Sequence, residues 1–321
     1  MSAAKRLIRI GSRTSALAMV QTEEVKEMLL KGREEELDVE IVPYSTKGDR
    51  VLDVALSKIG DKGLFTQELE DALLSGEIHM AVHSLKDMPT RLPEGLVLGA
   101  ISRRQATLDA VVFAPQHRGS ARSLSDLPAG SVVGTSSLRR TAQLRHAHGE
   151  HLQFRSVRGN VQTRLAKLDA HAEHGYDAII LAEAGLRRLA LHTRVHCLLD
   201  PSLCLPAVGQ GALAVEVSAA CEPWVLQLLR QHIDHPPTAA CCLAERAFLR
   251  SLEGGCQVPI GCHSLLSQDG LLLTLAGVVA SEDGSECFRA SVSGPPDEAL
   301  GIQLADELRR LGCERVLINR H

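Results

Sequence analysis

An adjacent base and acid, Lys86 and Asp87, follow an apolar run, Ile78–Val82, that predicts a buried strand. Pro89 disfavours helical geometry at Met88, so we expect both side chains in a tight loop at the strand end. Ligands of open α/β sheets bind at the carboxyl ends of strands. In that position Lys86 could hold an anion while Asp87 moves a proton. The alternative, a surface turn with a local ion pair, stays open from these residues alone.

Two arginines follow a predicted helix start. The strand Ser131–Gly134 leads through hydroxyl side chains to Ser137, a good N-cap residue, and then to Arg139 and Arg140. A helix N-terminus offers amide donors and a positive dipole to an anion. Arginines in the first turn oppose that dipole, and a bound anion would offset the repulsion. The segment therefore favours an anion site over arginines that are only solvated.

A third segment repeats this arrangement. The strand Leu152–Val157 is followed by Arg158, a glycine and the capping residue Asn160, and Arg164 lies early in the next predicted helix. Both arginines could point back toward the same anion, since guanidinium groups match the geometry of carboxylates. Solvated arginines on the helix face remain the alternative here.

Cys256 is a cysteine presented by glycines. A predicted helix ends at Gly254 and Gly255, and a strand is expected after Pro259. Such surroundings suit a residue that something bulky must reach, which indicates a nucleophile or an attachment point. No histidine can be assigned as its base, and a buried structural thiol stays an equal alternative. The sequence lacks the glycine patterns of nucleotide-binding loops, so nucleotide cofactors are disfavoured.

The charge distribution supports an anionic ligand. Residues 103–194 hold 13 Arg and 1 Lys against 4 Asp and 3 Glu, a net charge of +7, although the whole chain of 321 residues has −4. The remainder therefore carries −11. A basic middle segment that is rich in arginine favours carboxylate or phosphate recognition. Nucleic acid fits less well, because aromatic residues make up only 2% of the chain and stacking platforms need them.

Cysteine and histidine usage predicts a reducing compartment and no metal site. The 9 cysteines are scattered, and their spacing matches no zinc template. The 14 histidines lack a metal-binding pattern and are expected on solvated surfaces. No apolar run approaches the ~20 residues that a membrane span needs, and no signal peptide is recognisable. We therefore expect a cytoplasmic protein with free thiols and no membrane partner.

The hydrophobic periodicity predicts alternating strands and helices in two successive units. Expected strands are Leu7–Gly11, Glu40–Tyr44, Ile78–Val82, Asp109–Phe113, Ser131–Gly134, Leu152–Val157, Ala178–Ala182 and Ala212–Val217. Expected helices are Ser15–Leu30, Phe65–Ser75, 138–147, 161–171, one from Pro223, Thr238–Leu252 and Glu298–Leu311. A hairpin, Leu271–Ala280 with Glu286–Ser293, turns at Asp283-Gly284. The fold class is therefore α/β, with two doubly wound, mostly parallel sheets and a smaller α+β C-terminal domain.

Taken together, seven segments in order resemble the porphobilinogen deaminase (hydroxymethylbilane synthase) family over nearly the whole chain. The segments are Ile10–Ala18, Gly63–Phe65, Val82–Thr90, Val133–Arg140, Arg155–Arg164, Ala207–Ala212 and Leu252–Gly261. Each segment is weak evidence alone, but their common order is hard to explain otherwise. One departure stands out: the family commonly shows Arg-Glu-x-Pro-Arg-Asp after the first domain, whereas Arg103–Asp109 lacks the Glu, the Pro and the second Arg. The departure concerns contacts at the inter-domain hinge more than the chemistry.

The resemblance implies a fold and a reaction. The first two domains would resemble periplasmic binding proteins with a cleft between them, with boundaries at 1–104 (206–229 returning), 105–205 and 230–321. A dipyrromethane cofactor, joined to Cys256 by a thioether, would be extended by four porphobilinogen units, head to tail with loss of ammonia. Water would then release hydroxymethylbilane. The enzyme would be a transferase of porphyrin and heme biosynthesis and, by the same resemblance, a monomer.

The resemblance also implies roles for particular residues. Asp87 matches the catalytic aspartate, which handles the pyrrole nitrogens and the departing amine and stabilises the cationic azafulvene. Cofactor-binding positions are Cys256, Lys86, Ser84, Thr135, Ser137, Arg139, Arg140 and Arg164. Substrate-binding positions are Arg13, Ser15, Arg158, Phe65, Gln21 and Gln210.

Two other classes of protein fit the sequence less well. A non-catalytic carboxylate-binding protein of the periplasmic-binding-like fold explains the α/β domains and the arginines, but not Asp87 beside Lys86, the Gly-Gly-Cys loop or a third domain. A nucleic-acid-binding protein is weakened by the acidic remainder of the chain and the scarce aromatic residues.

Overall fold

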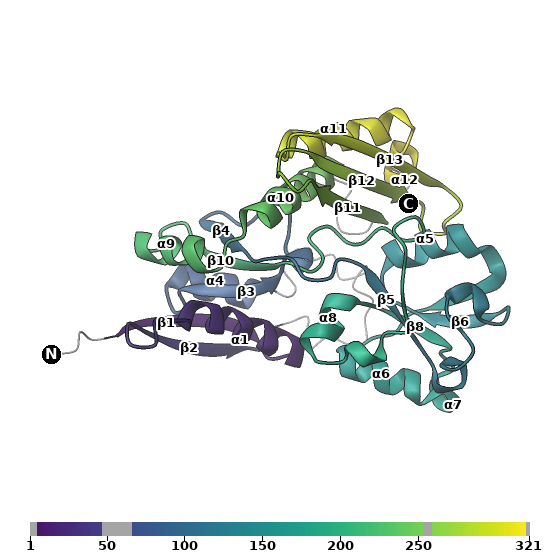
Figure 1. Ribbon diagram of the computed structural model, residues 1–321, viewed down its shortest axis with the longest axis horizontal. Coiled ribbons are helices and arrows are strands. Elements are labelled where there is room, and N and C mark those ends of the chain that lie inside the picture. Colours follow the sequence, from purple (N-terminus) through teal and green to yellow (C-terminus); the bar gives the residue numbers. More distant parts are fainter. Residues whose placement is uncertain (1–4, 47–65, 253–258, 319–321) are drawn as a thin grey trace. The chain divides into compact units, whose positions relative to one another are not determined.

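The computed structural model describes residues 5–46, 66–252 and 259–318 (Figure 1). The chain divides into two compact units, a first unit of residues 1–105 with 211–239 and a second unit of residues 106–210 with 240–321. The expected boundary between a basic domain and a C-terminal domain therefore falls inside the second unit, which contains two sheets.

The first unit is built on a five-stranded sheet with the order β2-β1-β3-β10-β4. Its strands are β1 (Arg6–Arg13), β2 (Leu37–Tyr44), β3 (Met80–Ser84), β4 (Leu96–Ile101) and β10 (Leu213–Ser218). β1 runs parallel to β2 and β3, whereas β10 runs antiparallel to both of its neighbours. Because β3 and β4 both pair antiparallel with β10, they run in the same direction, so among these five strands only β10 is reversed and the expectation of a mostly parallel sheet holds.

Helices cover both faces of this sheet. Helix α1 (Ala16–Leu30) and helix α9 (Pro223–His232) supply Val25, Leu29 and Leu229 to a core that they share with the strands. On the opposite face, helix α4 (Gln67–Ser75) packs Leu69 and Leu73 against the sheet. The sheet is therefore doubly covered, as the apolar strand sequences predict.

The second unit begins with another five-stranded sheet, of order β7-β6-β8-β5-β9. Its strands are β5 (Asp109–Phe113), β6 (Ser131–Gly134), β7 (Leu152–Arg155), β8 (Ala178–Ala182) and β9 (Cys197–Leu198). The helices are α5 (Leu138–His148), α6 (Val161–Asp169), α7 (His171–His174) and α8 (Glu183–Arg188). β6 is parallel to β7 and β8, and β5 is antiparallel to β8 and β9. Leu144 of α5 and Leu165 of α6 lie in separate cores on the two faces.

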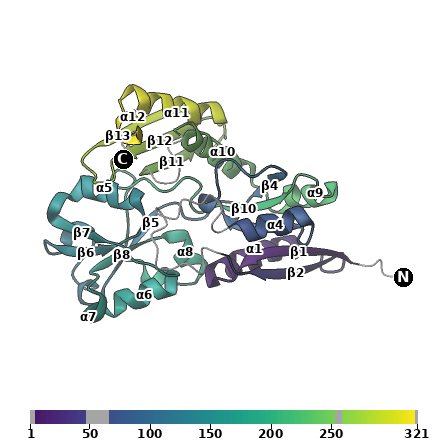
Figure 2. The ribbon, with the colours of Figure 1, turned by 180° about the vertical axis from the view of Figure 1, so that it is seen from behind.

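The C-terminal part of the second unit is a three-stranded antiparallel sheet with helices packed on it (Figure 2). Its strands are β11 (Ile260–Leu266), β12 (Leu273–Ala280) and β13 (Cys287–Gly294), and its helices are α10 (Pro236–Ser251), α11 (Glu298–Arg310) and α12 (Glu314–Ile318). The predicted hairpin is confirmed, since β12 pairs with β13 from Leu273 to Ala280. Gly284 adopts a φ of 77° in the turn, a backbone conformation that favours glycine.

Short 3-10 helices complete the described elements. They are η1 (Leu85–Asp87), η2 (Pro115–His117), η3 (Leu124–Asp126), η4 (Gly149–His151) and η5 (His192–Arg194). Within residues 5–46, 66–252 and 259–318, no helix has the length and apolar character that crossing a bilayer requires.

Candidate functional site

In the first unit, Lys86 and Asp87 lie in a tight turn at the end of a buried strand. β3 ends at Ser84, and η1 follows at once; Met88 is extended, with a φ of −85° and a ψ of 141°, as expected of a residue before proline. The backbone amide of Leu85 donates to the carbonyl of Ala212, at 3.0 Å, and anchors the turn to the segment that enters β10. Lys86 is half-buried and Asp87 is exposed. The predicted strand-end loop is confirmed.

Other predicted residues lie at the same edge of this sheet. Arg13 ends β1, which is parallel and adjacent to β3, so their carboxyl ends meet at one edge. Ser15 is the N-cap of α1 and accepts from the amide of Ala18, at 3.3 Å. The side-chain amide of Gln21 donates to Ser84 Oγ, at 2.8 Å. The first unit therefore gathers basic and hydroxyl groups around the turn that carries Asp87.

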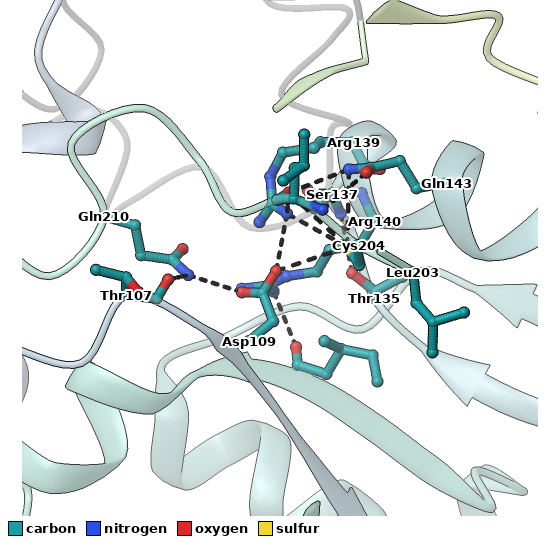
Figure 3. Close-up of polar contacts among 12 residues, drawn as sticks. Thr107, Asp109, Thr135, Ser137, Arg139, Arg140, Gln143, Leu203, Cys204 and Gln210 are labelled. Carbon is teal, nitrogen blue, oxygen red and sulfur yellow. Dashed lines mark hydrogen bonds and ion pairs between the residues drawn. The ribbon is translucent and has the colours of Figure 1, made fainter. Parts of the chain in front are cut away.

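In the second unit, a buried aspartate holds the predicted arginine pair (Figure 3). Asp109, the first residue of β5, is fully buried. Its Oδ2 lies 2.8 Å from Arg139 Nη1, and its Oδ1 lies 2.7 Å from Arg140 Nη2. Burial alone would raise the pKa of Asp109, but the two guanidinium groups outweigh it and hold that pKa far below its usual range.

The two arginines lie deeper than their positions in the sequence suggested. Arg139 and Arg140 are only 8% and 6% exposed. Arg139 also donates to the carbonyl of Leu205, at 2.6 Å, and Arg140 to that of Ile180, at 2.9 Å. The Nε of Arg140 is buried and has no hydrogen-bond acceptor among the described residues. Two guanidinium groups face one carboxylate, which leaves the cluster with a net positive charge.

The segment around Gln210 lies behind this cluster. Gln210 is fully buried, and its side-chain amide donates to Asp109 Oδ1, at 3.0 Å, and to the carbonyl of Thr107, at 2.8 Å. The neighbouring amide of Gly209 donates to the buried carboxylate of Glu245, at 2.7 Å. These contacts give Gln210 an indirect role, holding Asp109 in place.

The predicted helix caps are confirmed. Ser137 caps α5 and accepts from the amide of Arg140, at 3.4 Å, while Thr135 Oγ1 accepts from the amide of Ser137, at 3.2 Å. Asn160 caps α6 and accepts from the amide of Thr163, at 2.8 Å. The N-terminus of α5 therefore lies beside the arginine cluster, and its dipole adds to the positive field.

Arg158 and Arg164 flank the start of α6. Arg158 is half-buried and its carbonyl accepts from Lys167 Nζ, at 3.2 Å. Arg164 Nε donates to the carbonyl of Gly159, at 2.8 Å, so this side chain folds back over its own loop. Two predicted residues, Phe65 and Cys256, lie outside the described residues.

Sequence reasoning missed two polar residues of this cluster, Asp109 and Gln143. Asp109 opens a strand whose other residues are all apolar and buried, and a lone charge in that position signals a buried ion pair. Gln143 is 1% exposed and both donates to and accepts from the backbone of Leu205. Cys204, beside Arg139, is a thiol whose pKa burial raises to about 11.

The arrangement can hold anions. Surplus positive charge, a buried guanidinium nitrogen without an acceptor and a helix N-terminus together fit a ligand that carries carboxylates. In the described part of the chain, no three His, Cys, Asp or Glu side chains are grouped as metal ligands. The 8 described cysteines are all free thiols.

Two family models match the chain. The model described as "Porphobilinogen deaminase, dipyromethane cofactor binding domain" matches residues 8–224, and the model described as "Porphobilinogen deaminase, C-terminal domain" matches residues 239–310. Curated relatives named porphobilinogen deaminase are similar over almost the full length. The protein from Synechococcus elongatus is 54% identical over 320 residues, 99% of this chain and 96% of that protein. The protein from Gloeobacter violaceus is 53% identical over 315 residues, 97% of this chain and 93% of that protein.

Among solved structures, the periplasmic aliphatic sulphonate binding protein SsuA from Escherichia coli aligns with 79% of this chain and 72% of its own, at 15% identity and a TM-score of 0.39.

We predict that Asp109→Asn lowers the free energy of unfolding at pH 7 by about 3–5 kcal/mol, because two buried guanidinium groups lose their counter-charge. Urea unfolding measures this change. The control is Asp169→Asn: Asp169 also pairs with two arginines, Arg118 and Arg194, but its side chain is 41% exposed. That variant should lose less than about 1 kcal/mol, since exposed ion pairs are weak.

The ion pairs of Asp109 with Arg139 and Arg140 also predict how stability depends on pH. Because the folded-state pKa of Asp109 is depressed, its stabilisation is present above the unfolded-state pKa of about 3.9 and is lost as pH falls below that value. Asp109→Asn should therefore show a shallower loss of stability on acidification below about pH 4 than the unmodified protein. Equal losses of stability in the Asp109 and Asp169 variants at pH 7 would contradict the buried ion pair.

Proposed function

The chain belongs to the porphobilinogen deaminase family, and on that premise we propose that Cys256 carries its pyrrole primer and that Asp87 is its catalytic acid–base group. The protein is a transferase of tetrapyrrole synthesis: it joins four porphobilinogen units head to tail, with loss of ammonia, and releases hydroxymethylbilane. Its cofactor is dipyrromethane. The alternative of a non-catalytic carboxylate-binding protein is set aside, because the matched family is one of enzymes.

The buried arginine pair is the observation that best supports the binding of a ligand with many carboxylates. Each pyrrole of the substrate carries two carboxylates, so a growing chain needs many cations. Arg139 and Arg140 keep a surplus positive charge after pairing with Asp109, and the Nε of Arg140 has no acceptor among the described residues. Charge-assisted hydrogen bonds from guanidinium to carboxylate are about twice as strong as neutral ones.

The other proposed binding groups are cations and hydroxyls at strand ends and helix starts. In the first unit Lys86 lies in the turn that follows β3, and Arg13, Ser15, Gln21 and Ser84 lie at the same edge of the sheet. In the second unit Thr135, Ser137, Arg158 and Arg164 lie at the starts of α5 and α6. We assign carboxylate binding to these side chains, and we place Gln210 behind them as a support for Asp109.

Asp87 is suited to proton transfer by its position. Its carboxylate is exposed on a turn whose first residue, Leu85, is 1% exposed and bonded through its backbone amide to Ala212. A fixed backbone with an exposed carboxylate can hold a proton at the departing amine of porphobilinogen and then stabilise the cation that remains on the substrate. Lys86 alongside can hold a substrate carboxylate.

The cofactor fits the residues around the arginine cluster. When bound, dipyrromethane supplies the terminal pyrrole carbon to which the first substrate unit is joined. Its carboxylates would be held by Arg139, Arg140 and the hydroxyls of Thr135 and Ser137, which already cluster at the start of α5. Attachment through Cys256 would prevent the growing chain from diffusing away between additions.

We further propose that the protein acts in the cytoplasm as a monomer. Free thiols at all 8 described cysteines suit a reducing compartment. The substrate is a small molecule.

The proposed covalent primer on Cys256 can be tested by its mass. Because a thioether survives unfolding, the intact mass of denatured active enzyme should exceed the sequence mass by one dipyrromethane, and peptide mapping should place the adduct on Cys256. Cys256→Ser should lack both adduct and turnover. Cys287→Ser, which removes a half-buried free thiol, should keep both. Unmodified Cys256 in active enzyme, or an adduct on another cysteine, would refute the assignment.

The proposed catalytic role of Asp87 can be tested by substitution. Asp87→Asn keeps the size of the side chain but removes the group that can take up and release a proton, so kcat for porphobilinogen should fall by about 10²–10⁴-fold. The adduct mass should stay normal, which shows that the primer is in place. Asp71→Asn, an exposed carboxylate in the same unit, serves as the control and should keep normal turnover. Normal turnover in Asp87→Asn would remove Asp87 from the catalytic role.

A further inference from the structure

Three ionisable side chains are buried together on one face of the first unit's sheet. His83 of β3, Glu216 of β10 and Glu70 of α4 are 5%, 0% and 7% exposed. The proposed mechanism uses none of them. Burying ionisable groups in a protein core costs free energy, so we ask what these three side chains contribute to the structure.

His83 and Glu216 form a cross-strand pair. In the antiparallel ladder of β3 and β10, Ala214 lies opposite His83 and Glu216 lies opposite Ala81. Residues two apart on a strand share a face, so His83 and Glu216 are diagonal neighbours on the same side of the sheet. Glu216 Oε2 lies 3.1 Å from His83 Nε2.

Glu70 faces this pair from α4. Burial is the main cause that raises the pKa of Glu70; the Glu216 carboxylate and Asp71 raise it further, while Thr66 and His83 oppose the shift. Glu216, 3.1 Å away, is the carboxylate in direct contact with the imidazole of His83. Glu216 from β10 and Glu70 from α4 therefore both interact electrostatically with His83.

This pair is a poor source of stability. Glu216 Oε1 and Oε2 and His83 Nε2 are all buried, and none of them makes a hydrogen bond of good geometry among the described residues, so the 3.1 Å contact is electrostatic only. A buried ion pair stabilises a fold only when its geometry is good and its remaining lone pairs are satisfied, and apolar replacements of both partners are often as stable. Specifying one arrangement is the best-attested use of such buried polar pairs.

The register of β10 against its two neighbouring strands must be specified by particular side chains. β10 is flanked by β3 and β4, and its register with β4 shifts between Val215 and Glu216. A slip of one residue against β3 would turn Glu216 to the opposite face, among Val215, Val217 and the apolar core under α1. A slip of two residues would leave it on the correct face but away from His83.

The register of β10 also sets the position of the turn that carries Asp87. Leu213 lies opposite Ser84, and the carbonyl of Ala212 accepts from the amide of Leu85, at 3.0 Å. A change of register would remove this bond and shift the turn along the sheet edge.

We propose that Glu216 and His83 act as a register lock, which fixes β10 against β3 and so positions the Lys86–Asp87 turn. Both are positioning residues, since neither reaches the reacting atoms. The effect on catalysis rests on the proposed role of Asp87, whereas the effect on the strand register does not.

Amide hydrogen exchange and steady-state kinetics on the holoenzyme test the proposal. In Glu216→Gln the Leu85 amide should exchange at least about tenfold faster than in the unmodified enzyme. The kcat should fall by about 10–100-fold, since small misplacements of a catalytic group are costly, while KM for porphobilinogen changes less than about threefold. Val217→Ala is the matched control: it truncates a fully buried residue of the same strand without touching the pair. It should lower stability and leave both Leu85 exchange and kcat near normal.

A double variant, His83→Leu with Glu216→Leu, separates register from stability. It should be more stable than Glu216→Gln, because no polar side chain of the pair stays buried without a hydrogen-bond partner. It should still show fast Leu85 exchange, because two leucines lose little from a slip of two residues, which keeps both on the same apolar face of the sheet. Fast exchange with a normal kcat would support the lock and count against the role of Asp87. Leu85 exchange no faster in Glu216→Gln than in Val217→Ala would overturn the lock.

Discussion

The buried carboxylate of Asp109 is the constraint on which the rest of the second unit depends. It lies between two guanidinium groups that the fold has removed from water, and it compensates only one of their charges. Without it, two like charges would repel each other inside a core, and the start of α5 could not stay packed against β5 and β8. With it, the pair keeps a surplus positive charge in a fixed position, which suits a ligand that carries many carboxylates.

Support for Asp109 comes from distant parts of the same unit. Gln210 donates to Asp109, the adjacent Gly209 donates to Glu245 of α10, and Ser264 of β11 donates to the same glutamate. The C-terminal helix and sheet therefore help to hold the arginine cluster, in addition to flanking Cys256 in the sequence. Residues 103–109 depart from the usual sequence of the family, but this support is kept. Thr107 accepts the hydrogen bond from Gln210 through its backbone carbonyl, which any residue provides.

Much of the fold was predictable, because apolar periodicity, caps and turn glycines act locally. The hairpin of β12 and β13, the caps Ser137 and Asn160 and the turn after β3 all follow from such local patterns. The direction of β5 and β10, which run antiparallel to their neighbours, was not predictable from local patterns. It depends on which distant strands each of them pairs with. β4 was missed: Leu96–Ile101 is short and contains a glycine, although Pro93 and Gly95 mark its start. The anion-binding segments were predictable from arginines at helix starts, whereas their burial was not, since it depends on Asp109, 30 residues before Arg139.

The reaction and the carboxylate-binding role of the arginines rest on different kinds of observation. The reaction follows from family membership, whereas the carboxylate-binding role of the arginines follows from buried surplus charge. A crystal structure of the holoenzyme tests that second claim most directly. It should show Arg139 and Arg140 still paired with Asp109, with their remaining N–H groups within about 3 Å of pyrrole carboxylate oxygens. Cofactor carboxylates bound only by exposed side chains, with no contact to this pair, would contradict it.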